Sequence, residues 1–449
     1  MVEYDFKNDE IANICNNIIV YAASKRASDI HFDPVEAGLK VRLRIDGVLQ
    51  DHTLVPPLYQ KNLTTRIKLI SNMNITESRL PQDGSIKDSI NGIDLDMRVS
   101  ALNTNLGEKI VIRILDYSKS AEGLESLGFT PENLVKIKKM IEVPNGIILI
   151  TGATGTGKST TCYTMLQHLN NEETNIITVE DPIEMNIEGI NQVQVNSEIG
   201  LTFGRVLRSI LRQDPNIILI GEIRDTETAQ IAVRASITGH LVFSTIHTNN
   251  SLSTIERLLD MDVERYLLSS ALTGIVSQKL ARRLCKNCRL ERPTTDYEKA
   301  VFKEILNKDI ETIVDVDPDK HCDNCRNGYY GRIAIQEVLL INDEIKEAIN
   351  DSSLPRDKLR ELVYRGDVST LLQDGLNKVL EGITTFEEIY KNVAIDNELD
   401  EKYADDMNYA EVIDSEPEVI SGSSDSNSNF NDFEIIDNYN GEVVDTDII

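Results

Sequence analysis

The chain opens with short segments in which apolar and polar residues follow regular patterns. Over residues 8–27, apolar residues recur every three or four positions and predict one amphipathic helix. Three later segments alternate at every second position, as strands with one buried face do: 41–45, 94–100 and 110–114. The first of these ends at Asp46-Gly47, a strong hairpin signal. We therefore predict a small α+β domain, rich in hairpins, over residues 1–125.

After Pro131 the pattern changes, because short apolar runs without alternation now separate helical stretches. These runs are Ile147–Ile150, Ile176–Val179, Ile217–Ile220 and Leu241–Ser244. Unbroken apolar strands are typical of a mostly parallel sheet with helices on both faces. We predict an α/β domain over residues 126–280, a cysteine-bearing insert over 281–340, helices over 341–394 and an acidic, disordered tail over 395–449.

Charge sharpens this division. The 449 residues include 46 Lys and Arg and 74 Asp and Glu, for a net charge of −28. Residues 395–449 hold 17 of the acidic residues and one Lys, so the tail carries −16 and residues 1–394 carry an ordinary −12. An acidic chain with 5% aromatic residues and no basic stripe is poorly suited to nucleic acid, so no nucleic-acid partner is expected.

Two signals bear on localisation. No run approaches the roughly 18–20 apolar residues of a membrane span. The first residues also lack the positive start and apolar core of a signal peptide. We expect a cytoplasmic protein without direct membrane insertion, which would lie at the inner face of the cytoplasmic membrane through protein partners.

The strongest motif directly follows the first apolar run. It has the pattern G-x-x-x-x-G-K-[ST] and continues into a helical stretch: Gly152, Ala153, Thr154, Gly155, Thr156, Gly157, Lys158, Ser159 and then Thr160. In such a loop the backbone N–H groups and the helix N-terminus hold phosphates, the Lys reaches the β- and γ-phosphates and the next hydroxyl coordinates Mg²⁺. A Gly-rich turn would match this pattern by chance in about one chain of this length in a hundred. We therefore predict an ATP site in which Lys158 and Ser159 take these positions.

Two further apolar runs end in acidic residues. The first ends in Gly221-Glu222, a Walker B position with Gly where many such ATPases carry Asp, and the second ends in Glu180. The carboxyl ends of parallel strands meet at one sheet edge, where α/β proteins bind ligands. We expect Glu222 to support Mg²⁺ there, with Glu180 nearby. Another run is bracketed by His240 and His247, whose spacing alone indicates no function.

Further segments complete a pattern with the phosphate loop and the two acidic strand ends: Ala27–His31, Arg79–Gly84, Leu211–Pro215, Gly221–Asp225, Gly239–Asn249, Gly331–Glu337 and Gly382–Glu388. In these segments, and in their order, the chain resembles the hexameric ATPases of type IV pilus assembly and type II secretion over residues 20–392. The resemblance implies a RecA-like P-loop ATPase core with an N-terminal α+β domain of PAS-like fold.

The resemblance also implies functions for individual side chains. Glu180 would be the general base or position the attacking water, Glu222 would be the Walker B carboxylate, and His247 would contact the γ-phosphate. Arg98 and Arg113 match arginines of the N-terminal domain that reach the nucleotide, where a guanidinium neutralises charge on the transferred phosphoryl group. The alternative for each arginine is an ion pair with an acidic residue on the strand surface.

The chain departs from the family in several places. Ala153 stands where Pro is usual and Ser159 where Thr is common, and neither change threatens the chemistry. Ser85 replaces a frequent Arg, so a phosphate contact is expected to be lost there. The chain also begins without the extra N-terminal domain that such ATPases usually carry. That start implies a different recruitment surface, for which the acidic tail is a candidate.

Four cysteines form two C-x-x-C pairs separated by 33 residues: Cys285 with Cys288, and Cys322 with Cys325. Four thiolates on two tight turns favour a closed, tetrahedral Zn²⁺ site of the structural type. The alternatives are a thioredoxin-like redox pair, which needs only one such motif, and surface disulfides, which are rare in reduced compartments. In the resembling family, the tetracysteine pattern marks assembly and secretion motors, and retraction motors lack it.

The resemblance implies a homohexamer that hydrolyses ATP with Mg²⁺ and drives pilin polymerisation through a polytopic inner-membrane platform protein. Type II secretion and DNA uptake through a pseudopilus are alternatives that share the motifs. Two more distant alternatives are a nucleic-acid translocase and a regulatory module that binds nucleotide without hydrolysing it. The charge of the chain opposes the first, and the acidic residues beside the loop oppose the second.

Overall fold

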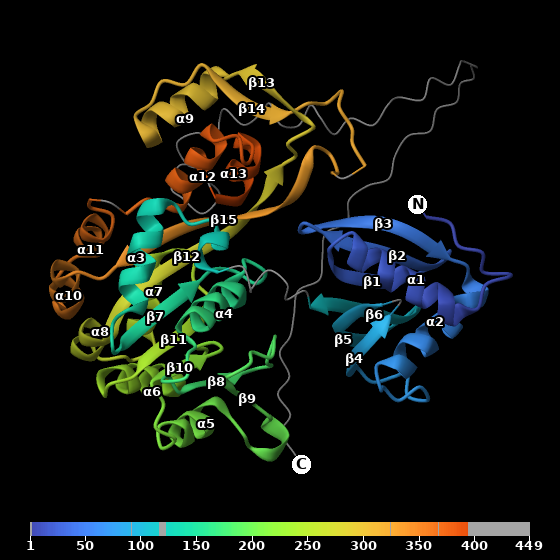
Figure 1. The fold of residues 1–449 in the computed structure, drawn as a ribbon, viewed down its shortest axis with the longest axis horizontal. Coiled ribbons are helices and arrows are strands. Elements are labelled where there is room, and N and C mark those ends of the chain that lie inside the picture. The colour runs from blue at the N-terminus through green and yellow to red at the C-terminus, as the bar shows by residue number, and fades with distance from the viewer. Residues whose placement is uncertain (1, 91, 116–122, 324, 367, 394–449) are drawn as a thin grey trace, which may run out of the picture. The chain divides into compact units, whose positions relative to one another are not determined.

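The computed structural model describes residues 2–90, 92–115, 123–323, 325–366 and 368–393 (Figure 1). The predicted acidic tail lies outside the described residues. In the part of the chain that the structure describes, the helices are too short or too polar to cross a membrane.

The alternating segments near the N-terminus fold into a six-stranded antiparallel sheet with the order β3-β2-β1-β6-β5-β4. Its strands are β1 (Ala27–Val35), β2 (Gly38–Ile45), β3 (Val48–Val55), β4 (Gln82–Ile90), β5 (Ile93–Thr104) and β6 (Gly107–Leu115). Two helices, α1 (Ile11–Ser24) and α2 (Pro57–Ile70), share its apolar core. The predicted hairpin is confirmed, because Asp46 and Gly47 join β2 to β3 with positive φ angles of 49° and 90°.

The unbroken apolar runs form the centre of a seven-stranded sheet with the order β15-β12-β7-β11-β10-β8-β9. All neighbouring strands are parallel except β15 and β12. The strands are β7 (Gly146–Thr151), β8 (Ile176–Glu180), β9 (Asn191–Gln194), β10 (Ile217–Ile220), β11 (Leu241–Ile246), β12 (Leu272–Leu284) and β15 (Tyr329–Leu340). Every residue of β7, β8, β10 and β11 is buried, which confirms the four strands predicted from unbroken runs.

Successive residues of these strands pack into two different cores. In β7, for example, Ile147 and Leu149 belong to one core, and Ile148 and Ile150 belong to the other. Helices α5 to α8 supply the first core and α3 and α4 supply the second. These helices are α3 (Pro131–Ile141), α4 (Lys158–Leu169), α5 (Phe203–Ile210), α6 (Thr226–Ile237), α7 (Ser251–Asp260) and α8 (Arg265–Ala271). The sheet is therefore covered on both faces, as its lack of alternation predicts.

The cysteine-bearing segment lies between the long strands β12 and β15. It contains a two-stranded sheet, β13 (Arg289–Pro293) with β14 (Thr312–Val316), and helix α9 (Asp296–Leu306). The helices that follow are α10 (Asp343–Asn350), α11 (Arg356–Val363), α12 (Leu371–Leu380) and α13 (Phe386–Val393). Helices α10 and α11 join the first core of the large sheet, whereas α12 and α13 pack with α9. The C-terminal helices thus share cores with both preceding segments.

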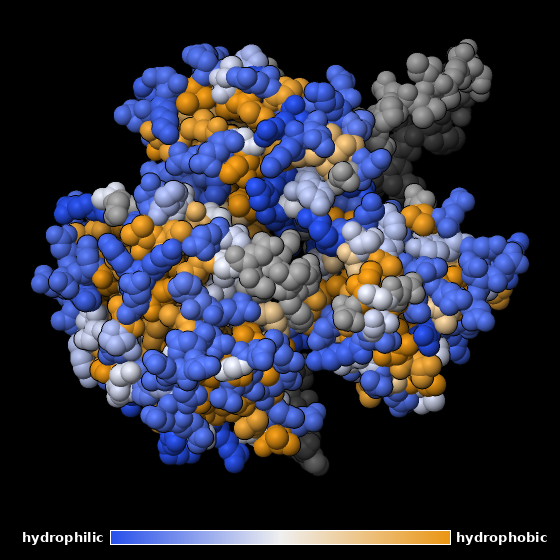
Figure 2. Space-filling model, viewed as in Figure 1, coloured by the Kyte–Doolittle hydropathy of each residue, from blue (hydrophilic) through white to orange (hydrophobic). Residues whose placement is uncertain are grey.

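Large apolar side chains that remain exposed are concentrated in the N-terminal domain. Of fourteen such residues among those described, nine lie between residues 48 and 106. They are Val48, Leu54, Leu58, Leu69, Ile75, Leu80, Ile93, Leu102 and Leu106. Figure 2 shows apolar residues in small groups between hydrophilic ones on the face that it draws. Apolar residues that are exposed singly are ordinary on a protein surface, so this distribution alone does not identify a contact surface.

Candidate active site

The phosphate loop connects the end of β7 to the start of α4 (Figure 1). Its three glycines, Gly152, Gly155 and Gly157, have positive φ angles of 145°, 82° and 88°. A Cβ atom at Gly152 would lie 2.4 Å from the carbonyl oxygen of Gln278, and one at Gly157 would lie 2.9 Å from its side-chain nitrogen. The loop therefore needs glycine for its backbone conformation and, at two positions, for its close contact with β12.

The side chains of the loop differ sharply in exposure. Lys158 is 9% exposed, and its ammonium group donates to the carbonyl oxygens of Gly152 (2.8 Å) and Ala153 (2.9 Å). Burial lowers the pKa of Lys158 from its ordinary value. Ser159 and Thr160 are exposed in the first turn of α4. Two hydroxyl groups thus lie at the end of the helix where the dipole attracts phosphate. The tip of the loop is exposed and consists of Ala153, Thr154 and Gly155.

Gln278 of β12 forms hydrogen bonds with the phosphate loop and was not predicted from the sequence. Its side chain is 2% exposed, donates to the carbonyl oxygen of Thr156 (2.6 Å) and accepts from the hydroxyl of Thr161 (2.9 Å). One buried amide thus ties the loop to the helix that follows it. The sequence held no signal for Gln278, because β12 also contains Ser277, Lys279 and two arginines.

Parallel pairing places the ends of β7, β11, β10 and β8 next to one another in this order (Figure 1). The last residue of β11 is level with the last residue of β7, and the last residue of β10 is level with Val179 in β8. His247 follows β11, Glu222 follows β10 after one glycine, and Glu180 ends β8. The structure thus brings these three side chains to the sheet edge that carries the phosphate loop.

Glu222 lies among charged groups. Its side chain is 14% exposed, Oε1 lies 2.5 Å from Nη2 of Arg224 and Oε2 lies 3.6 Å from Nε2 of His247. The hydrogen bond that Arg224 donates to Glu222 raises the pKa of Arg224. A Cβ atom at the preceding Gly221 would lie 3.2 Å from Cα of Glu180. Glycine at this Walker B position therefore lets the ends of β10 and β8 approach closely.

Glu180 is buried, with 4% of its surface exposed. Its carboxylate accepts hydrogen bonds from the side chains of Tyr163, Thr178 and Gln192, all of which are neutral. None of these three donors was predicted as a site residue, because they come from α4, β8 and β9 and share no motif. The carboxylate predicted as general base is thus held by side chains rather than exposed to water.

The loop after β11 is tied to the end of β7. The hydroxyl of Thr151 donates to the carbonyl oxygen of Thr248 (2.6 Å) and accepts from its backbone N–H (3.1 Å). His247 keeps 49% of its side chain exposed at this point. His240, at the other end of β11, uses Nδ1 to contact the carbonyl oxygen of Ala235 (2.9 Å) and lies outside the site.

The two arginines of the N-terminal domain have different surroundings. Arg98 in β5 donates to the carbonyl oxygen of Ile183 and lies 3.7 Å from the carboxylate of Glu184, in the segment after β8. Arg113 in β6 pairs with Asp29 in β1, with 3.0 Å between Nε and Oδ1. Arg98 thus contacts the segment that directly follows the predicted site residue Glu180. Arg113 instead forms an ion pair with an acidic residue on the strand surface, which was the alternative to a contact with the nucleotide.

The four motif cysteines form one cluster. The sulfur atoms of Cys285, Cys288, Cys322 and Cys325 all lie within 4.8 Å of one another, and those of Cys285 and Cys322 are 3.8 Å apart. Ligands at Zn–S distances of about 2.3 Å in a tetrahedron place sulfur atoms roughly 3.8 Å apart. The number, type and spacing of the donors therefore fit a closed tetrahedral metal site.

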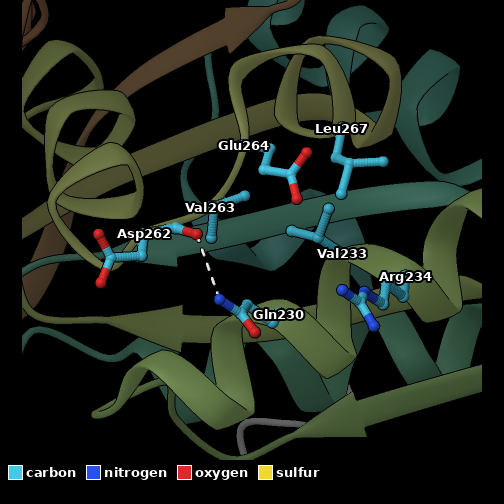
Figure 3. A pocket seen from close by; sticks show the side chains of 7 residues that line it. All are labelled: Gln230, Val233, Arg234, Asp262, Val263, Glu264 and Leu267. Carbon is cyan, nitrogen blue, oxygen red and sulfur yellow. Dashed lines mark hydrogen bonds between the residues drawn. The ribbon is translucent and has the colours of Figure 1, made fainter.

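A separate shallow pocket lies between α6 and the turn before α8 (Figure 3). The side chain of Gln230 donates to the carbonyl oxygen of Asp262 (3.2 Å) at its edge. The residues that line it are Gln230, Val233, Arg234, Asp262, Val263, Glu264 and Leu267. None of them was predicted to bind nucleotide or metal, so we assign the pocket no part in the site.

A phosphate loop between a buried strand and a helix, with carboxylates at two neighbouring strand ends, defines a P-loop nucleoside triphosphatase. The family model for the Type II/IV secretion system protein matches residues 5–391 of this chain. The chain belongs to this family and is an ATPase of the secretion and pilus type.

Named relatives match most of the chain. The type II secretion system protein E of Pectobacterium carotovorum is 44% identical over 382 residues, which make up 85% of this chain and 75% of that protein. The type IV pilus assembly ATPase PilB of Myxococcus xanthus is 43% identical over 389 residues, or 86% of this chain and 68% of that protein.

Two solved structures have similar folds. The pilus retraction motor PilT with bound ADP is 26% identical and has a TM-score of 0.57, covering 84% of this chain and 96% of that one. The ATPase DotB of Legionella pneumophila has a TM-score of 0.64 at 20% identity, covering 86% of this chain and 97% of that one. The predicted family and the predicted α/β fold class are confirmed.

Proposed function

We propose that this chain is a motor that hydrolyses Mg²⁺-ATP to drive type IV pilus assembly through an inner-membrane platform protein. The main support is the sheet edge where the phosphate loop, Glu222 and Glu180 meet, in a chain 43% identical to a pilus assembly ATPase. Type II secretion is the second candidate, because a relative of that name is 44% identical.

In this proposal five side chains take part in the transfer of a phosphoryl group to water. Lys158 leaves the loop carbonyls and binds the β- and γ-phosphates. Ser159 and Glu222 would hold Mg²⁺, which would supply positive charge opposite the phosphates. Glu180 orients the attacking water and accepts its proton, and His247 contacts the γ-phosphate and responds to its loss.

Arg98 and Arg113 are proposed to bring positive charge to the nucleotide. The contact of Arg98 with the segment after β8 supports this function for Arg98. The support for Arg113 is the family resemblance, and its ion pair with Asp29 must open before it can reach a phosphate.

The test of the catalytic assignment is Glu180→Gln, which keeps the shape of the side chain and removes its ability to accept a proton. We expect ATP binding within about twofold of wild type and a fall in kcat of at least about a thousandfold. Steady-state hydrolysis and fluorescent-nucleotide binding measure the two quantities. Glu188→Gln is the matched control, because Glu188 is exposed in the segment that follows and contacts none of the site residues described above. Undiminished hydrolysis by Glu180→Gln would refute the assignment.

We also propose that the motor is a homohexamer, recruited to the inner face of the cytoplasmic membrane by a polytopic platform protein. The support for the ring is the resemblance to the hexameric ATPases of type IV pilus assembly and type II secretion. Mass photometry of the full chain with a non-hydrolysable ATP analogue is expected to show a hexamer. Co-expression with the platform protein is expected to move the chain to the membrane fraction. A monomer under the first condition would contradict the ring.

The cysteine cluster is proposed to hold a structural Zn²⁺ ion, because four thiolates at tetrahedral spacing leave no open coordination position. Elemental analysis should find one zinc per chain. Cys288→Ser should lose the metal and unfold at a lower temperature, because the cluster joins the loop after β12 to the loop before β15. Cys15→Ser is the control, since Cys15 is buried in the N-terminal core, far along the chain from the cluster. A Cys288→Ser protein with full zinc content would exclude the site.

A further inference from the structure

The carboxylate of Glu180 sits in a cradle of three neutral donors, which come from three different elements. The hydroxyl of Tyr163 in α4 donates to Oε2. The hydroxyl of Thr178 in β8 donates to Oε1 (2.6 Å), and Nε2 of Gln192 in β9 donates to the same oxygen (3.1 Å). Both carboxylate oxygens are therefore engaged, and the orientation of the side chain is fixed by its surroundings.

Tyr163 is the member of this cradle that joins it to the phosphate loop. It lies five positions after Lys158 in α4, and 3% of its surface is exposed. Besides donating to Glu180, its hydroxyl accepts a hydrogen bond from the backbone N–H of Glu184 (3.1 Å). Burial and the neighbouring carboxylate raise the pKa of Tyr163, so the hydroxyl stays protonated and donates at neutral pH.

We propose that Tyr163 is a positioning residue for hydrolysis, which sets the orientation of the Glu180 carboxylate relative to the phosphate loop. The inference rests on the proposed function of Glu180 as the base. A donor on α4 connects the carboxylate to the helix whose first turn is proposed to bind phosphate. A structural alternative exists, in which the hydroxyl only satisfies a buried carboxylate and stabilises the core.

The test is Tyr163→Phe, which removes one oxygen and keeps the ring in the core. We expect kcat to fall about ten- to a hundredfold, because a hydrogen bond to a charged acceptor is lost. ATP affinity should stay within about twofold of wild type, as for an interaction that matters in the transition state. The pH–rate profile is recorded in parallel, because a hydroxyl that only stabilises the core would leave that profile unchanged when it is removed.

Tyr329→Phe is the matched control. The hydroxyl of Tyr329 also makes a partly buried hydrogen bond, to Thr385 (2.8 Å), in the cysteine-bearing part of the chain. Thermal unfolding of both variants measures the cost of a lost tyrosine hydroxyl. A lower unfolding temperature for Tyr163→Phe, with wild-type kcat and pH profile, would show the structural alternative and overturn the proposal.

Two further variants keep the outcomes distinct. If Tyr163→Phe does not fold, Thr178→Val removes a donor from another element of the cradle, and unchanged kcat and pH profile in that variant would overturn the proposal. Glu180→Gln is measured in parallel. If it is inactive and Tyr163→Phe has wild-type kcat and pH profile, the positioning function is refuted and the proposed function stands. If Glu180→Gln hydrolyses ATP at the wild-type rate, the base assignment fails, and the inference fails with it.

Discussion

Glu180 and Glu222 lie at the ends of neighbouring parallel strands at the same sheet edge, yet different interactions hold each of them. Glu180 is buried and accepts hydrogen bonds from neutral side chains of three elements. Glu222 is paired with Arg224, whose side chain is 61% exposed, and lies 3.6 Å from His247. The carboxylate of Glu180 is therefore fixed by neutral donors, and that of Glu222 is held by charged side chains that are partly exposed to solvent.

The difference matches the two functions proposed for these residues. A base must keep one orientation toward a water molecule, and neutral donors that are packed in the core provide it. A metal ligand must exchange one cationic partner for another. An ion pair with an exposed arginine contributes only about 0–1 kcal/mol, so the proposed exchange of Arg224 for Mg²⁺ at Glu222 would have a small cost.

Gly221 separates the two carboxylates and offers the strongest way to break the arrangement. Because a Cβ atom there would lie 3.2 Å from Cα of Glu180 and 3.3 Å from the carbonyl oxygen of Val179, a larger side chain must push the end of β8 away. Gly221→Asp would also add a third carboxylate. We expect kcat to fall by about a hundredfold or more, and overpacking to cost about 1–3 kcal/mol of stability. Steady-state hydrolysis and thermal unfolding measure both effects.

Gly221→Ala separates the steric effect from the added charge. It places only the Cβ atom near Glu180, and the neighbouring backbone must shift by a few tenths of an ångström. We therefore expect a decrease in kcat of about three- to tenfold, well short of the effect of Asp. Wild-type hydrolysis by Gly221→Asp would show that the spacing of the two strand ends does not matter.

The sequence predicts four of the seven strands of the large sheet, β7, β8, β10 and β11, because their apolar runs are unbroken and lie between helical segments. Strands β9, β12 and β15 were not predicted, because they contain polar residues. Element ends were less accurate. The helix predicted over residues 8–27 is α1, Ile11–Ser24; Arg26, just beyond it, has a φ of 59°, which ends helical geometry. The grouping of the C-terminal helices was not predictable from periodicity. An apolar helical face does not indicate which distant core it joins, and α10 to α13 divide between two cores.

The same limit applies to the site. The phosphate loop was predictable because its residues are contiguous and each position has one chemical requirement. Gln278 was missed because its partners lie 117 and 122 positions earlier in the chain. Tyr163 was not predicted as a site residue, although its hydroxyl contacts Glu180. Such supporting contacts depend on which strands become neighbours, and a single sequence does not state the strand order.

The smallest expected effect comes from a test of the ion pair between Arg224 and Glu222. Arg224→Gln removes the guanidinium that occupies Oε1 of Glu222. Mg²⁺ then no longer competes with an ion pair, so the Mg²⁺ concentration for half-maximal hydrolysis should fall by about two- to fivefold, the range of an exposed pair. kcat at saturating Mg²⁺ should change little. Raising the salt concentration should narrow the difference in Mg²⁺ requirement between the wild type and the variant, because salt screens the ion pair.

Arg208→Gln is the control for this experiment. Arg208 in α5 pairs with Glu227, and both side chains are more than half exposed. The substitution therefore removes an exposed ion pair of the same kind, but from an acidic residue that is not proposed to bind Mg²⁺. Its Mg²⁺ requirement should match that of the wild type at every salt concentration. If Arg224→Gln raises the Mg²⁺ requirement instead, the guanidinium helps to assemble the metal site. Arg224 would then hold Glu222 in the orientation that binds Mg²⁺, as the neutral donors hold Glu180. The contrast between the two strand ends would therefore be wrong.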